Sequence, residues 1–144
     1  MDEQLRIFDR LLEVSMLIQH DLERSFAGTG LTAARTHLLW ELHRLGPSNQ
    51  RTLAEALQVS PRNVTGLVDA LEAGGFVTRS AFPGDRRALQ VSLTAHGAET
   101  VEQMERDRVT MAAQLVSGLS AQQRTGLARS LDSVVAELEA LVSR

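Results

Sequence analysis

Four consecutive residues combine a helix-start signal with side chains that can read nucleic-acid bases. Ser60 and Pro61 precede Arg62 and Asn63. Ser is a preferred N-cap residue and Pro suits the first helical position, so we expect a helix to begin here. A guanidinium can donate two hydrogen bonds to guanine, and a carboxamide can pair in the same way with adenine. The pattern is typical of a helix whose first turn faces base edges in a DNA groove.

A second segment combines turn-forming residues with two adjacent arginines. Pro83-Gly84 leads directly into Asp85, Arg86 and Arg87. Pro, Gly and Asp favour tight turns. An arginine at the tip of a hairpin can enter a narrow minor groove, where the potential of DNA is most negative. Asp85 would be repelled by phosphate, so we expect it to shape the turn or to orient a neighbouring arginine through a salt bridge.

Residues 31–94 contain the elements that would position both segments. Apolar residues at helical spacing predict three short helices, and an alternating pattern then predicts two strands around a turn. The expected helices cover 33–45, 50–57 and 61–73, with Thr32, Asn49 and Ser60 as N-caps, and the expected strands cover 76–80 and 88–93 around a turn at 82–87. The expected core residues are Leu38, Leu39, Leu42, Leu45, Leu53, Ala54, Leu57, Val64, Leu67, Val68, Leu71, Leu89, Val91 and Leu93. Two short helices, a tight turn between them and a following hairpin make a winged helix-turn-helix.

The candidate DNA contacts lie in the first turn and on the outer face of the third helix, in the first strand and in the turn. They are Ser60, Pro61, Arg62, Asn63, Thr65, Gly66, Arg79, Arg86 and Arg87. The alternative for each of them is an ordinary surface position without a DNA contact. Arg79 either contacts phosphate or braces the wing through Asp85. Asp69, on the same helix, would be repelled by phosphate, so we expect it to be an internal salt-bridge or helix partner.

Helices are also predicted on both sides of this lobe. Apolar residues recur at helical spacing from Asp2 to about Phe26 and again after Thr94, where Ser120 opens a capping box after a break near Gly118. The first and last helices carry wide apolar faces, which pack within a monomeric bundle or against a second copy; we favour the homodimer. The expected fold is mainly α with a small β-wing (α+β): an N-terminal dimerisation helix (1–30), a winged helix-turn-helix lobe (31–94) and C-terminal dimerisation helices (95–144).

The composition narrows the function classes. Of 144 residues, 43% are apolar and 23% are charged, which excludes a disordered chain, while a net charge of −3 does not exclude DNA binding. The chain has no cysteine and four scattered histidines, so we expect no metal and no cofactor. The N-terminus is acidic and has no apolar core run, and no run of about 18 apolar residues exists, so we expect no signal peptide and a cytoplasmic protein without membrane contact.

From Gly46 to Gly97 the sequence resembles the MarR family of bacterial transcriptional regulators. The matching positions are Gly46-Pro47, Leu53-Ala54, Leu57, Val59-Ser60, Val64-Thr65, Leu67-Val68-Asp69, Leu71-Glu72, Gly75, Val77, Arg79, Asp85-Arg86-Arg87, Leu93-Thr94 and Gly97. The resemblance implies a homodimer with interlocked first and last helices. It implies two recognition helices in successive major grooves of a near-palindromic operator, and wings in the flanking minor grooves. The arginine of the family's Asp-x-Arg wing motif corresponds to Arg87, with Arg86 as the second candidate.

Three positions depart from the family's pattern. Gln58 stands where Gly is frequent, in the turn between the two helices, and Arg35 stands where Gln is frequent. Gly66 leaves the recognition helix without a large side chain in the middle of its face, at a cost of about 1 kcal/mol in helix stability. A glycine there lets the helix backbone approach DNA more closely.

The resemblance also implies that a small ligand, often an aromatic or phenolic acid, changes DNA affinity. We therefore expect a sequence-specific regulator, and more specifically a repressor. Met16, His20, His37 and Trp40 on the first two helices are candidates to line the ligand site, although for Trp40 we favour core packing. The alternative is a DNA-binding regulator without an effector, controlled by its abundance or by a protein partner. An enzyme is not expected, because the sequence has no cysteine nucleophile, no phosphate loop and no His–carboxylate cluster with a Gly-rich approach.

Overall fold

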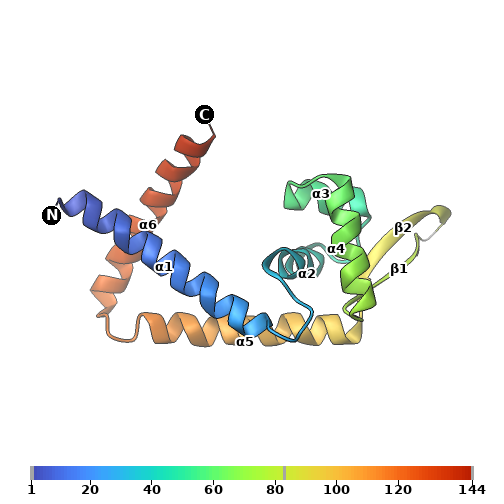
Figure 1. The fold of residues 1–144 in the computed structure, drawn as a ribbon, viewed down its shortest axis with the longest axis horizontal. Helices are drawn as coiled ribbons and strands as arrows, with labels where there is room; N and C mark the ends of the chain where they lie inside the picture. Colours follow the sequence, from blue (N-terminus) through green and yellow to red (C-terminus); the bar gives the residue numbers. More distant parts are fainter. Residues whose placement is uncertain (1, 83, 144) are drawn as a thin grey trace. The chain divides into compact units, whose positions relative to one another are not determined.

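A computed structural model describes residues 2–82 and 84–143, and for residues 82 and 85–88 it describes the backbone alone. The elements in chain order are α1 (Glu3–Phe26), α2 (Ala33–Leu45), α3 (Gln50–Leu57), α4 (Pro61–Ala73), β1 (Val77–Phe82), β2 (Asp85–Leu93), α5 (Ala95–Leu115) and α6 (Ala121–Val142) (Figure 1). The expected fold class, mainly helical with a small antiparallel sheet, is confirmed. Residue contacts divide the chain into two compact units, Met1–Glu102 and Gln103–Arg144.

The helices of the first unit begin where capping residues satisfy their free N–H groups. The side chain of Thr32 accepts a hydrogen bond from the backbone N–H of Arg35 at 3.2 Å. Asn49 accepts one from the N–H of Thr52 at 2.7 Å. Such a side-chain acceptor contributes about 1 kcal/mol to helix stability. These two N-cap predictions are confirmed, and in the second unit the capping box at Ser120 is confirmed as well.

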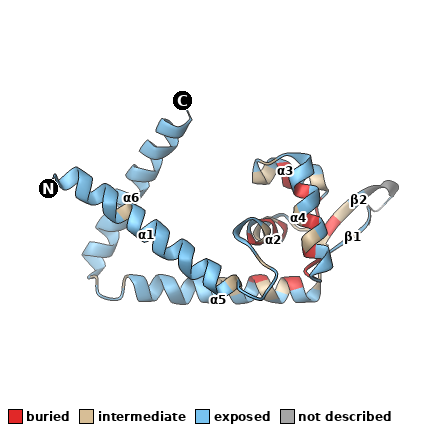
Figure 2. Ribbon diagram, viewed as in Figure 1, coloured by how far each residue is buried: buried red, intermediate tan, exposed pale blue. Residues whose placement is uncertain are grey.

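The core of the first unit forms where α2, α3, α4 and the base of the hairpin meet (Figure 2). Its fully buried side chains include Leu38, Leu39, Leu42, Leu53, Val64, Val68, Leu71, Val77, Val91 and Val101. The predicted core is largely confirmed, but Leu45 and Leu89 are 40% and 51% exposed, so their assignment was wrong. Leu45 is the last residue of α2, and Leu89 lies beyond the point at which the hairpin is attached to the lobe.

That attachment is a short backbone bridge between the hairpin and the segment before α3. The N–H of Ser48 donates to the carbonyl of Val91 at 3.0 Å, and the N–H of Val91 donates to the carbonyl of Ser48 at 2.7 Å. Both residues are buried. The base of the hairpin is thereby fixed to the helical lobe, and the part nearer its turn extends away from the core.

The hairpin itself differs from the prediction. Its strands run to Phe82 and start again at Asp85, and these two residues pair with each other. The six-residue turn expected at 82–87 is therefore wrong, because Phe82 belongs to β1 and residues 85–87 belong to β2, and Gly84 has φ +84°. The regular register, from Val77 opposite Leu93 to Ala81 opposite Leu89, shifts at the next pair. Such a register irregularity bends a strand and changes where its side chains point.

A glycine lets the first turn of α5 pack closely against the start of the hairpin. A Cβ atom built on Gly97 would lie 2.0 Å from the carbonyl oxygen of Phe76. Thr94 ties the same junction together, because its hydroxyl donates to the carbonyl of Gly75 at 2.6 Å and accepts from the N–H of Gly97 at 3.0 Å. The path from wing to α5 is thus determined by local contacts.

Two helices keep their apolar faces exposed in the single chain (Figure 2). No residue along the described length of α1 or α6 is buried. The exposed apolar residues of α1 include Leu5, Phe8, Leu12, Ile18 and Leu22, and those of α6 include Leu127, Leu131, Val134, Leu138 and Leu141. None of the helices described over residues 2–82 and 84–143 is long and apolar enough to cross a bilayer.

Candidate nucleic-acid interface

The first turn of α4 is built as the sequence predicts. The hydroxyl of Ser60 accepts a hydrogen bond from the N–H of Asn63 at 3.1 Å, and Pro61 occupies the first helical position. Arg62 and Asn63 follow with their side chains exposed to solvent. Because the cap fixes the start of the helix, it also fixes the direction in which these two side chains leave the backbone.

The two faces of α4 are chemically distinct. Val64, Val68 and Leu71 are fully buried against the lobe. The opposite face is exposed, and it carries Arg62, Asn63, Thr65, Gly66 and Asp69. Arg62 takes part in no ion pair among the described residues, so its guanidinium is available to a ligand. The structure thus brings the predicted helical residues together on one polar surface.

Gly66 is open on this surface. A Cβ atom built there would meet no atom within 4 Å. The packing of the protein itself therefore does not require a glycine at this point of the helix. A helix pays about 1 kcal/mol of stability for an interior glycine compared with alanine. This leaves close approach of an external molecule as a reason for the residue.

Arg79 is bound to residues of its own lobe. Its guanidinium forms ion pairs with Asp69 at 2.6 Å and Glu72 at 2.9 Å, and its Nε donates to the side-chain oxygen of Gln50 at 3.0 Å. The prediction that Asp69 is an internal salt-bridge partner is confirmed. Of the two alternatives for Arg79, the structure supports an internal brace rather than a phosphate contact, and the brace runs to α4 and α3.

The basic segment of the hairpin begins at the first residues of β2. The predictions for the side chains of Asp85, Arg86 and Arg87 lie outside the described residues. Their backbone belongs to β2, beyond the regular part of the register. The assignment of Arg87 as the leading wing residue, with Arg86 as the second candidate and Asp85 as a structuring residue, stays a prediction.

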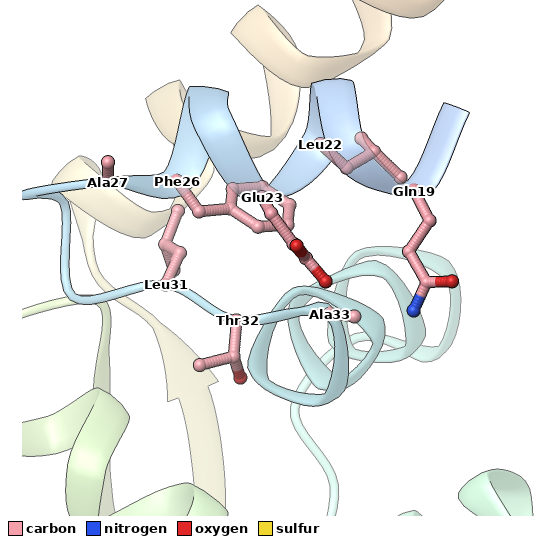
Figure 3. A pocket seen from close by; sticks show the side chains of 8 residues that line it. All are labelled: Gln19, Leu22, Glu23, Phe26, Ala27, Leu31, Thr32 and Ala33. Carbon is pink, nitrogen blue, oxygen red and sulfur yellow. The ribbon is translucent and has the colours of Figure 1, made fainter. Parts of the chain in front are cut away.

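A pocket of about 360 Å³ lies between the end of α1 and the start of α2 (Figure 3). Its lining residues are Gln19, Leu22, Glu23, Phe26, Ala27, Leu31, Thr32 and Ala33. The lining is predominantly apolar, with Phe26 and Leu22 beside the polar ends of Gln19 and Glu23 (Figure 3). From the sequence we predicted a ligand site on the first two helices, but we named none of these lining residues as a candidate.

The four predicted ligand contacts are not among the residues that line this pocket. Met16 and His20 are exposed on α1, and His37 lies 3.7 Å from the carboxylate of Glu41. Trp40 is half-buried, and its ring meets that of His43 edge-on with the centroids 6.4 Å apart. Trp40 is therefore partly buried, and it is not among the fully buried core residues.

Comparison with known proteins places this geometry among DNA-binding regulators. The model of the MarR family matches residues 31–89. The HTH-type transcriptional repressor YetL of Bacillus subtilis is 35% identical over 104 residues, which are 69% of this chain and 60% of YetL. The chain thus spans less than two thirds of that relative. The HTH-type transcriptional regulator PecS of Dickeya dadantii is 27% identical over 92% of this chain and 81% of its own length.

Solved structures share the fold over nearly the whole chain. FabT of Streptococcus pneumoniae, solved in complex with DNA, has a TM-score of 0.85 at 20% identity and covers 96% of this chain and 99% of its own. RV1404 of Mycobacterium tuberculosis has a TM-score of 0.73 at 29% identity, with 95% of both chains covered. The similarity therefore extends beyond residues 31–89 to the flanking helices.

Proposed function

This chain belongs to the MarR family, and from that premise we propose that it is a transcription regulator that binds double-stranded DNA through α4 and the β1–β2 hairpin. The observation that carries the proposal is the exposed polar face of α4, which starts at a Ser-Pro cap and continues through Arg62 and Asn63. Residues at the N-terminal end of a recognition helix are the ones that reach base edges in the major groove. We propose a repressor, in line with the name of YetL.

We further propose that the protein acts as a homodimer. The support comes from the apolar faces of α1 and α6, which have no cover within their own chain over their described lengths. Contiguous apolar surfaces of this extent mark interaction sites. A two-fold axis would present two copies of α4 to one face of the duplex, about one helical turn apart, so the operator would be a near-palindrome. The protein would then work where the DNA is, which for its bacterial relatives is the cytoplasm.

A small molecule in the pocket between α1 and α2 would be the effector. The proposed dimer helix is α1, and α2 belongs to the DNA-binding lobe. A ligand between them can therefore favour one distance between the two copies of α4 over another, and so change the affinity for DNA. Glu23 is the charged residue in the lining, so a carboxylate would be repelled there. An uncharged phenol fits better, since its hydroxyl can donate to Glu23 while its ring packs against Phe26.

Two substitutions test the DNA-binding surface with a duplex selected from a random pool. Arg87→Ala is expected to weaken binding to selected and random duplexes alike and to flatten the salt dependence by about one unit, because it removes one phosphate neutralisation.

Asn63→Ala is expected to relax preference at one base pair per half-site, at a cost of about 1–3 kcal/mol. Arg44→Ala is the control, since that exposed arginine of α2 pairs with Glu41.

The outcomes separate the two roles. If Arg87→Ala leaves both the affinity and the salt dependence unchanged, the wing does not contact DNA. If Asn63→Ala gives the same selected sequence as the unaltered protein, Asn63 does not read a base. A phenol panel added to the same assay tests the effector, because release of the duplex by a phenol is expected only if the pocket couples to DNA binding.

A further inference from the structure

We propose that Arg79 is the positioning residue that sets the hairpin relative to the recognition helix, and that DNA discrimination depends on it although it makes no DNA contact. This inference rests on the proposed function. Arg79 lies in β1, opposite Val91 in the register. Its side chain is 17% exposed and reaches two other elements of the lobe, α4 and α3.

All the nitrogen positions of Arg79 are used by three side chains. One terminal nitrogen pairs with Asp69 at 2.6 Å and the other with Glu72 at 2.9 Å. The Nε donates to Gln50 at 3.0 Å, and the backbone N–H of Arg79 donates to the second carboxylate oxygen of Glu72 at 3.0 Å. A planar guanidinium holds such partners in fixed directions, which a flexible ammonium does not. The strand therefore cannot turn relative to α4 without breaking several of these bonds.

The same cluster reaches the surface that we assign to DNA. The side-chain nitrogen of Gln50 donates to the hydroxyl of Thr65 at 3.0 Å, and that hydroxyl donates to the carbonyl of Pro61 at 3.0 Å. Thr65 is thus held in one orientation on the exposed face of α4. With its proton committed to Pro61, the hydroxyl can only accept from a base, and its methyl group stays free to contact a thymine methyl. Arg79 and Gln50 together link the strand to a side chain of the reading surface.

The charge of the cluster argues against a direct role in DNA binding. Asp69 and Glu72 contribute two negative charges and Arg79 one positive charge, so the cluster carries a net charge of −1 beside a surface meant for phosphates. Such a charge lowers attraction for any DNA sequence. The cluster is therefore best explained by the positions in which it holds β1 and Thr65. Those positions affect which DNA sequence is selected, and they do not raise affinity for DNA in general.

The test compares Arg79→Gln with Arg44→Gln, which alters an exposed arginine of the same lobe that pairs with Glu41. Affinity is measured for the selected duplex and for a random duplex across a salt series, at a temperature where circular dichroism shows each variant folded. We expect Arg79→Gln to lower affinity for the selected duplex about tenfold more than affinity for the random duplex, the equivalent of one lost base contact, because the lost positive charge weakens binding to both duplexes alike. Arg79→Lys is expected to lose discrimination as Arg79→Gln does, because one ammonium cannot hold three partners.

Three results would overturn the inference. Equal loss for both duplexes with a flatter salt slope would make Arg79 a phosphate contact. A lower melting temperature with unchanged discrimination would make it a structural brace alone. Full recovery of discrimination by Arg79→Lys would show that only the charge matters. If the unaltered protein selects no duplex at all, the proposed function fails and this inference fails with it.

A second variant keeps the inference testable if Arg79→Gln does not fold. Gln50→Leu leaves both ion pairs of Arg79 in place, and it removes the hydrogen bond from the Nε of Arg79 together with the link to Thr65. Because Gln50 is a half-exposed residue at the start of α3, the fold is expected to tolerate the change. The selected sequence is expected to lose its preference at one base pair per half-site. An unchanged preference would mean that the link to Thr65 has no part in reading DNA.

Discussion

At the scale of single residues, the reading surface is defined as much by a missing side chain as by those present. Gly66 lies in the middle of the exposed face of α4, with no protein atom within 4 Å of the position that a Cβ would take. Arg62 and Asn63 lie one turn before it on the same face. Close approach of the helix backbone at Gly66 would bring both side chains deeper into a groove. The residue is therefore better explained by binding than by folding.

Gly66→Ala tests that explanation because it predicts opposite effects on stability and binding. Alanine is expected to raise the free energy of unfolding by about 1 kcal/mol, since it restores helix propensity in open space. It is expected to weaken binding to the selected duplex, because the added methyl group stands between helix and DNA. Thermal unfolding and duplex titration of the same preparation measure both. A variant that is more stable and binds equally well would show that the backbone does not approach DNA here.

Residue types predicted the backbone geometry correctly where the residue interacts only with its neighbours in the sequence. Ser60 and Asn49 cap helices because each needs only its own backbone neighbours to do so. Gln58 was recognised as unusual, and it does adopt the left-handed conformation, at φ +55°, for which glycine is better suited. The role of Arg79 could not be decided in advance, because its partners are 7, 10 and 29 positions away and come together only in the fold.

At the scale of elements, the junction between the hairpin and α5 is the most tightly determined. Gly97 packs its backbone against the carbonyl of Phe76, and Thr94 bonds to both sides of the junction. Ser48 and Val91 form the second attachment at the base of the hairpin. Together these contacts fix the base of the wing, so that its position depends on backbone contacts and on the Arg79 cluster.

Gly97→Ala is expected to destabilise the fold. The added Cβ would lie 2.0 Å from a backbone oxygen, so the first turn of α5 must shift, and overpacking of this kind costs about 1–3 kcal/mol. Gly126→Ala in α6 is the matched control: it lies in open space and is expected to stabilise its helix by about 1 kcal/mol. Chemical denaturation of both variants gives the comparison. Equal or higher stability for Gly97→Ala would contradict the close packing of α5 on Phe76.

Helix boundaries were predictable from caps and apolar spacing, but the hairpin was not. The helices α3 and α4 match their expected ranges because Asn49, Ser60 and the glycines after α4 mark their ends. The strands extend closer to the turn than expected, since β1 reaches Phe82 and β2 begins at Asp85. The register shift after Ala81 has no sequence signal that separates it from a longer loop. For the same reason Leu89 was placed in the core, although it lies outside the attached part of the hairpin.

At the scale of the whole molecule, the proposed reading of DNA depends on a second copy of the chain. The apolar stripes of α1 and α6 stay exposed over their described lengths, and the lobe has a complete core of its own. One copy would place one α4 on the duplex, and two would place a pair related by symmetry. Binding of a ligand in the pocket beside the end of α1 would then depend on the conformation of the dimer and would change it in turn.

Leu138→Glu is expected to convert the dimer to a monomer. Leu138 is 57% exposed within the apolar stripe of α6, and a buried unpaired carboxylate in a subunit interface is costly. Ala136→Glu adds the same charge on the opposite side of the helix, two positions away, and is expected to stay dimeric. Sedimentation velocity distinguishes the two states. If Leu138→Glu and the unaltered protein sediment alike, α6 does not form the interface.

The most direct measurement of the central claim is the symmetry of the DNA that the protein selects from an unbiased random pool. A dimer that reads DNA with two copies of α4 predicts an enriched near-palindrome whose half-sites are centred about 10 base pairs apart, one turn of the duplex. It also predicts that Leu138→Glu loses this enrichment. Enrichment of a single, unrepeated half-site, or of no sequence at all, would contradict the account.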